Sequence, residues 1–170
     1  MKKKVIVING AGGVGKDTLC EMAALKYKVK NVSSITPIKD LAAQCGWDGE
    51  KSDKARKFLS DLKRLTTEYN DFPTNWIYNE YLKFLKSEEE IMFVHIREAG
   101  EISKFVERTE GEAVTLLIRG GKRFEGREKY GNASDDLVEE YQYDFYFTND
   151  NPIEETAEVF CSFLESIVDI

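Results

Sequence analysis

The stretch GAGGVGKDT, Gly10–Thr18, follows directly on the apolar run VIVIN at residues 5–9. A short apolar run of this kind indicates a buried strand, and the apolar spacing from residue 16 to about residue 27 indicates a helix. The glycines therefore lie in a tight connection from strand to helix. Because the N–H groups at a helix N-terminus bind anions, the stretch predicts a phosphate site.

Two nucleotide-binding patterns fit the same glycines. Gly10, Gly12 and Gly15 match GxGxxG, and Gly10 with Gly15 and Lys16 match the GxxxxGK of a P-loop. A dinucleotide site usually has an acidic residue about 20 positions further on, but the segment KNVSS at residues 30–34 has none. Lys16 stands where a P-loop lysine reaches the β- and γ-phosphates. We therefore predict a P-loop that holds ATP. The ATP-binding residues predicted in this stretch are Gly10, Ala11, Gly12, Gly13, Val14, Gly15, Lys16, Asp17 and Thr18.

The residue after the P-loop lysine departs from the usual pattern. That position normally carries the Ser or Thr that binds Mg²⁺, whereas here Asp17 occupies it and Thr18 follows. We predict that Asp17 and Thr18 face the metal. A second interpretation stays open, in which Asp17 is only a favourable carboxylate in the first turn of a helix.

Alternating strand and helix patterns run along the rest of the chain. They predict a three-layer α/β sandwich of the P-loop NTPase type, with a central parallel sheet of about five strands and helices on both faces. All 170 residues are expected to form one domain. The expected strands cover 4–9, 29–35, 90–96, 113–118 and 143–149, and the expected helices cover 16–27, 37–46, 53–69, 74–87, 99–107 and 152–168.

Composition narrows the class of partner. The chain is 42% hydrophobic and no apolar run approaches the roughly 18 residues of a membrane span. A net charge of -7 argues against a general nucleic-acid binder, which needs a basic face. The three cysteines are odd in number and lack metal-site spacing, so a reducing cytoplasm is expected. We expect a small-molecule substrate and no nucleic-acid or membrane partner.

The tetrapeptide GKDT at residues 15–18 resembles that of P-loop nucleoside monophosphate kinase-like proteins, above all the phage-type deoxynucleoside monophosphate kinases. Animal-type phosphomevalonate kinases share it. The similarity covers nearly the whole chain, although only the P-loop is a specific motif. It implies transfer of a phosphoryl group from ATP, with Mg²⁺, to a small phosphorylated acceptor. The other similar segments are SITPIKDLAAQCG at 34–46, DKARKFLSDLKR at 53–64, VHIREAGEI at 94–102, NASDDL at 132–137 and YDFYFTNDNPIEET at 143–156.

The resemblance also implies an acceptor-binding helical segment over about 37–86. Lys39, Arg56 and Arg97 match its acceptor-binding residues, and Arg97 is also expected to act in catalysis. His95 stands where the family has an Asp that helps to hold Mg²⁺. Because a neutral imidazole is a poor ligand for hard Mg²⁺, we expect His95 to be a partly buried residue packed at a strand end, with a role as a base as the alternative.

A polar, glycine-rich segment over about 120–134 is long for a loop and resembles the lid of these kinases. Their lid arginines close over the phosphates, which implies catalytic roles for Arg123 and Arg127 and an ATP contact for Arg119. A solvated basic loop is the alternative. Asn149, after the last strand, matches a position near the adenine.

A nucleoside or deoxynucleoside monophosphate is the acceptor that the resemblance favours. The sequence leaves two alternatives open. One is a kinase acting on dephospho-coenzyme A or phosphomevalonate. The other is a nucleotide-binding P-loop protein with weak or no kinase activity, which His95 at the Asp position favours.

Overall fold

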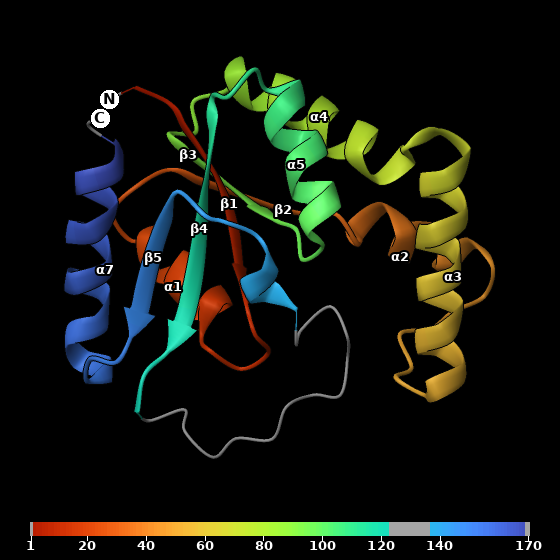
Figure 1. Ribbon diagram of the computed structural model, residues 1–170, viewed down its shortest axis with the longest axis horizontal. Coiled ribbons are helices and arrows are strands. Elements are labelled where there is room, and N and C mark those ends of the chain that lie inside the picture. Colours follow the sequence, from red (N-terminus) through yellow and green to blue (C-terminus); the bar gives the residue numbers. More distant parts are fainter. Residues whose placement is uncertain (1, 123–136, 169–170) are drawn as a thin grey trace.

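A computed structural model describes residues 2–122 and 137–168 and confirms the three-layer α/β fold. One sheet of five parallel strands forms the central layer, and its strand order is β2-β3-β1-β4-β5 (Figure 1). The strands are β1 (Lys4–Gly10), β2 (Val29–Ser33), β3 (Ile91–His95), β4 (Ala113–Gly120) and β5 (Phe145–Asn149).

Helices cover both faces of this sheet, as the alternating apolar faces of its strands require. Helices α1 and α7 pack with Ile6 and Ile8 on one face, whereas α4 and α5 pack with Val5 and Val7 on the other. The helices are α1 (Lys16–Ala23), α2 (Thr36–Gln44), α3 (Asp53–Asn70), α4 (Phe72–Leu85), α5 (Ala99–Arg108) and α7 (Ile153–Val168), and a short 3₁₀ turn, η2, spans Val138–Glu140. No described helix is long and apolar enough to cross a membrane.

The central position of β1 places its end among the ends of its neighbours. Ile8 of β1 pairs with His95, the last residue of β3, and Gly10 pairs with Ile118 of β4. Asn149 closes β5 beside Gly120. Because all five strands are parallel, these carboxyl ends meet at one edge of the sheet, where ligands bind in open α/β folds.

Helices α2 and α3 extend to one side of the sheet (Figure 1). Ser52 caps α3 by accepting a hydrogen bond from the Ala55 N–H at 3.1 Å. Ala55 is the only buried residue of this long helix. Most of the α3 surface is therefore open, in contrast to the helices that cover the sheet.

The expected elements are all present, with differences at their ends. The first helix ends at Ala23, not at about residue 27, because the chain turns back to enter β2 and leaves Leu25 exposed. Helix α4 begins two residues earlier than expected, at Phe72, because Pro73 fits a first helical turn, where no N–H partner is needed.

Candidate nucleotide site

The loop between β1 and α1 surrounds a cavity of about 280 Å³ at the carboxyl edge of the sheet. Gly13 and Gly15 have φ values of 81° and 87°, a left-handed backbone that glycine adopts without strain. A Cβ on Gly10 would lie 2.9 Å from the carbonyl oxygen of Ile118, so glycine is needed for close packing there. The lining residues are Gly10, Ala11, Gly12, Gly13, Val14, Gly15, Lys16, Asp17, Thr18 and Arg97.

The start of α1 is arranged to bind an anion. Gly15 is its N-cap and supplies no side-chain cap to the N–H groups of the first turn. Lys16, the first residue of the helix, adds a cation to the positive end of the helix dipole. Backbone donors and an ammonium group on one cavity are the combination that phosphate oxygens require.

Asn149 supports this loop from the end of β5. Its side chain is buried and donates a hydrogen bond from Nδ2 to the carbonyl oxygen of Val14 at 2.8 Å. The sequence predicted Asn149 near the adenine. The structure gives it a contact that fixes the P-loop backbone, and the adenine contact stays a prediction.

Asn9 connects the P-loop to the segment that carries Arg97. Its buried side chain accepts a hydrogen bond from the Gly10 N–H at 2.9 Å and donates from Nδ2 to the Arg97 carbonyl at 3.1 Å. The same amide donates to the Tyr143 hydroxyl at 2.9 Å, which itself donates to the Val138 carbonyl at 2.8 Å. Three segments far apart in sequence therefore converge on one buried amide, and Arg97 lines the P-loop cavity.

The two residues that depart from the usual pattern lie side by side: Asp17 lines this cavity, and His95 is next to Asp17. The Nδ1 atom of His95 is 3.9 Å from Asp17 Oδ1. Burial lowers the pKa of His95 to about 4, and the Lys16 charge acts in the same direction, so the imidazole is neutral at pH 7. The expectation of a partly buried histidine at a strand end is confirmed, since its side chain is 15% exposed.

Asp17 and Thr18 fit a hard dication, because a carboxylate and a hydroxyl are the oxygen ligands that Mg²⁺ prefers. Both line the cavity. Among the described residues, no group of three or more His, Cys, Asp or Glu side chains gathers as a metal site. A nucleotide and water would supply further ligands to a metal held here.

Lys63 binds two carboxylates close to Arg97 in the chain. Its Nζ lies 2.8 Å from Glu98 Oε2 and 2.9 Å from Glu101 Oε2. Burial raises the pKa of Glu101, whose side chain is 11% exposed. Burial acts in the same sense on Glu98, but the Lys63 charge outweighs it and lowers the pKa of Glu98. The cluster ties α3 to the start of α5.

Of the three arginines predicted to act in or beside the lid segment, the structure describes only Arg119. Arg119 forms a two-point ion pair with Glu139, with Nε–Oε1 and Nη2–Oε2 distances of 2.9 and 2.8 Å, and its guanidinium lies 4.4 Å from the centre of the Tyr146 ring. Arg123 and Arg127 lie outside the described residues. Their roles, and the ATP contact of Arg119, stay predictions.

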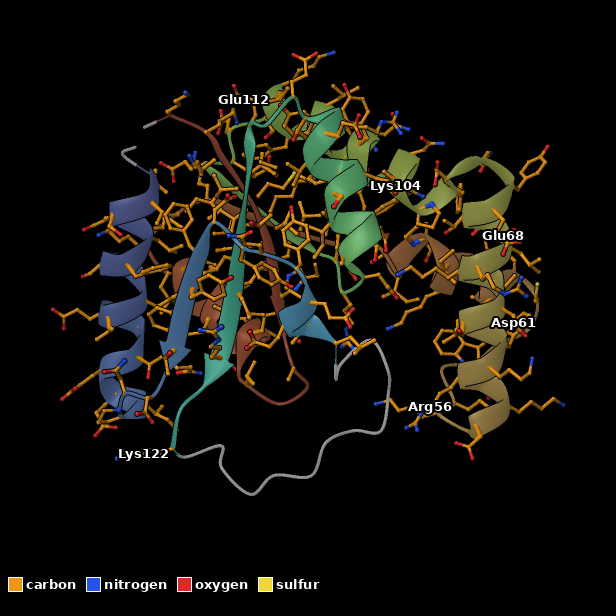
Figure 2. All side chains as sticks on the ribbon, viewed as in Figure 1. Arg56, Asp61, Glu68, Lys104, Glu112 and Lys122 are labelled. Atoms are coloured by element: carbon orange, nitrogen blue, oxygen red, sulfur yellow. The ribbon has the colours of Figure 1, made fainter. Side chains whose placement is uncertain are left out.

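The predicted acceptor residues do not all gather at the P-loop. Arg97 lines the cavity, whereas Lys39 and Arg56 are exposed on α2 and α3 and do not line it. In Figure 2, Arg56 lies near the start of α3 at the lower right, whereas Lys122, which follows β4, lies at the lower left. Acceptor contacts by Lys39 and Arg56 therefore stay predictions.

A larger cavity of about 390 Å³ lies away from the P-loop, between α2, α3 and the start of α4. Leu41, Leu65, Tyr69 and Phe72 give it an apolar lining. Of these two cavities in the described part of the chain, the smaller one is the candidate nucleotide site, because it combines backbone donors at a helix start with a lysine and an arginine.

Comparisons with known proteins identify the fold. No protein-family model matches the chain, and no curated protein sequence matches it significantly. Its backbone is similar to solved structures of low sequence identity. The tunicamycin resistance protein of Deinococcus radiodurans has a TM-score of 0.60 and 11% identity, with 96% of each chain covered.

Two kinases are also similar. For shikimate kinase of Bacteroides thetaiotaomicron, the TM-score is 0.52 at 14% identity, with 98% of this chain and 99% of that chain covered. For a gluconokinase of Sinorhizobium meliloti, the TM-score is 0.51 at 12% identity, with 99% and 94% covered. The chain therefore has the α/β fold of P-loop small-molecule kinases, with strand order 2-3-1-4-5.

Sequence reasoning missed several residues that shape the site. Asn9 carried a signal, since it is a polar residue at the end of a buried apolar run. Lys63 lies on a mostly exposed helix and gave no signal for its contact with Glu98 and Glu101. No sequence signal marks the role of Tyr143 either, because its hydrogen-bond partner Asn9 is 134 residues away.

Proposed function

We propose that this protein is an ATP-dependent kinase that transfers the γ-phosphoryl group to a small phosphorylated acceptor, a nucleoside or deoxynucleoside monophosphate. One observation carries the proposal: Lys16 and Arg97 line the same cavity as the P-loop glycines. Backbone N–H groups and Lys16 suit the triphosphate, and Arg97 adds a second cation to the lining of the cavity. Positive charge around the transferring group is the main requirement of this chemistry.

The acceptor chemistry explains why no general base is needed. A phosphate monoester has its second pKa near 6, so it is already largely a dianion at pH 7 and can attack directly. The neutral His95 is therefore not required to remove a proton. Arg97 suits the acceptor phosphate because its planar guanidinium binds two oxygens at once.

The metal would be held by Asp17 and Thr18. When bound, Mg²⁺ neutralises charge that develops on the β- and γ-oxygens. The chain's own residues supply the rest: Lys16 and the loop backbone orient the triphosphate, and Asn9 fixes the main chain of Arg97 against the loop.

An acceptor screen tests the proposal. The protein is incubated with Mg-ATP and a panel of ribo- and deoxynucleoside monophosphates, dephospho-coenzyme A and phosphomevalonate, and ADP and each phosphorylated product are quantified. We expect product from a nucleoside monophosphate, and its loss in Lys16→Ala. A matched control is Lys28→Ala, since this lysine is exposed and lies just before β2, at the other edge of the sheet.

Other outcomes would overturn part or all of the proposal. Product from dephospho-coenzyme A or phosphomevalonate alone would replace the acceptor class. ATP binding without acceptor-dependent ADP would favour a nucleotide-binding protein that does not transfer phosphate, the function that His95 at the Asp position favours.

A further inference from the structure

His95 lies beside Asp17, which lines the P-loop cavity. Nδ1 of His95 lies 3.9 Å from Oδ1 of Asp17. The Asp17 side chain is 85% exposed and free to turn, whereas the His95 side chain is 15% exposed and held at the end of β3. The P-loop thus carries a carboxylate next to Lys16, and the end of β3 carries an imidazole.

The other ring nitrogen of His95 determines which atom faces Asp17. Nε2 lies 3.2 Å from Asn31 Oδ1, on the adjacent strand β2. The Sγ atom of Cys20 lies 4.0 Å from the same nitrogen. Because an amide oxygen only accepts hydrogen bonds and Asn31 is the nearer of the two groups, we place the ring proton on Nε2. Nδ1 then directs an unprotonated lone pair toward the Asp17 carboxylate. Two acceptors placed in this way do not bind each other, and a cation between them would satisfy both.

The hydrogen bond on Nε2 is also the usual arrangement of a metal-binding histidine. Such a histidine donates its second N–H to a neighbouring oxygen, which fixes the tautomer and the plane of the ring. Asn31 provides that oxygen here.

The spacing of the two donors is compatible with one metal ion. Metal–nitrogen and metal–oxygen bonds of about 2.0–2.2 Å allow two ligands of one ion to lie up to about 4.4 Å apart. The separation of 3.9 Å lies within that limit. Phosphate oxygens and water would complete the coordination, because the same cavity holds the P-loop backbone and Lys16.

The ligand types decide which metal fits. Oxygen ligands suit Mg²⁺, whereas imidazole favours first-row transition-metal ions. We propose that Asp17 and His95 together bind a first-row transition-metal dication, with Mn²⁺ as the probe, on the triphosphate in this cavity and in preference to Mg²⁺. The inference rests on the proposed function only in that a nucleotide occupies the P-loop.

Pulsed electron paramagnetic resonance of bound Mn²⁺ tests this directly. The ternary complex of protein, Mn²⁺ and a non-hydrolysable ATP analogue is prepared with natural-abundance protein and again with ¹⁵N-labelled protein. We expect a ¹⁴N coupling from the directly bound imidazole that becomes a ¹⁵N coupling in the labelled protein. Because the nucleotide is unlabelled in both samples, its own nitrogens do not change.

Two variants give a second readout by calorimetry. We expect His95→Asp to lose the nitrogen coupling and to lower the preference for Mn²⁺ over Mg²⁺ about tenfold, equivalent to about 1.4 kcal/mol. We expect Asn31→Ala to weaken Mn²⁺ binding at least about tenfold, as loss of a second hydrogen-bonding partner does at other metal sites.

The outcomes separate this inference from the proposed function. Nucleotide binding with Mn²⁺ but without a protein nitrogen coupling would overturn the inference and leave the kinase proposal intact. Failure of the protein to bind the nucleotide with either metal would overturn both.

Discussion

Replacing Asn9 by alanine should damage both the stability and the nucleotide site. The substitution removes the acceptor of the Gly10 N–H and the donor to the Arg97 carbonyl. Tyr143 loses its bond to Asn9 but keeps its bond to the Val138 carbonyl. A buried polar group that loses its partner costs about 1–3 kcal/mol, so loss of the acceptor for the Gly10 N–H lowers the free energy of unfolding by about that amount.

This loss is large enough to measure by thermal denaturation. In a domain of this length, 1 kcal/mol shifts Tm by about 2–4 °C, so Asn9→Ala should lower Tm by at least about 2 °C. Nucleotide affinity, measured by calorimetry at a temperature where the variant is folded, should fall about tenfold, because Asn9 holds the first P-loop residue against the Arg97 segment.

Tyr143→Phe is the matched control. It removes the hydroxyl that binds Asn9 and Val138 but keeps the Asn9 contacts with Gly10 and Arg97. We expect a lower Tm with unchanged nucleotide affinity. The reasoning would be refuted by an Asn9→Ala variant that keeps the wild-type Tm, or by equal nucleotide affinities in the two variants.

Three further substitutions test other parts of the structure. Burial lowers the pKa of His95 from 6.5 to about 4. The neutral imidazole therefore contributes about 3 kcal/mol to the free energy of unfolding above pH 6.5, and this contribution is lost as the pH falls toward 4. His95→Gln should remove that part of the pH dependence in urea denaturation, and an unchanged slope would contradict the assignment. Lys63→Met should lower the free energy of unfolding by about 1.5–3 kcal/mol, because it removes the charged hydrogen-bond partner of two carboxylates. Lys57→Met, at an exposed ion pair, should lower it by less than about 1 kcal/mol. Equal losses in denaturant unfolding would disprove this. Gly10→Ala should lower the free energy of unfolding by about 1–3 kcal/mol and weaken nucleotide binding, because the new Cβ would lie 2.9 Å from a backbone oxygen. Gly100→Ala, where the Cβ would enter open space, should be neutral or stabilising. Similar effects of the two substitutions on Tm would argue against the close packing at Gly10.

Local patterns explain how much of the fold was predictable. The P-loop follows from neighbours in sequence: an apolar strand, glycines that allow positive φ at Gly13 and Gly15, and Lys16 at the start of a helix. Strand and helix periodicity gave the order of elements, and the helix ends differed by a few residues where the chain turned or where Pro73 allowed an early start.

Contacts between distant segments account for what the sequence did not predict. The Asn9 amide meets the Arg97 carbonyl 88 residues away, and Lys63 meets Glu98 across 35 residues. No local pattern encodes such distances, because they depend on which strands become neighbours in the sheet. His95 and Asp17 both depart from the family pattern, and the pairing of β1 with β3 brings them within 3.9 Å of each other.

The function proposed for the P-loop cavity is transfer of the γ-phosphoryl group of ATP to a phosphorylated acceptor. ³¹P nuclear magnetic resonance follows this in one sample of protein, Mg-ATP and the preferred acceptor of the screen. We expect the γ-signal of ATP to decline as a new phosphoanhydride signal of the acceptor rises by the same amount, and we expect Lys16→Ala to abolish both changes. Release of inorganic phosphate without a new acceptor signal, or unchanged transfer in Lys16→Ala, would contradict it.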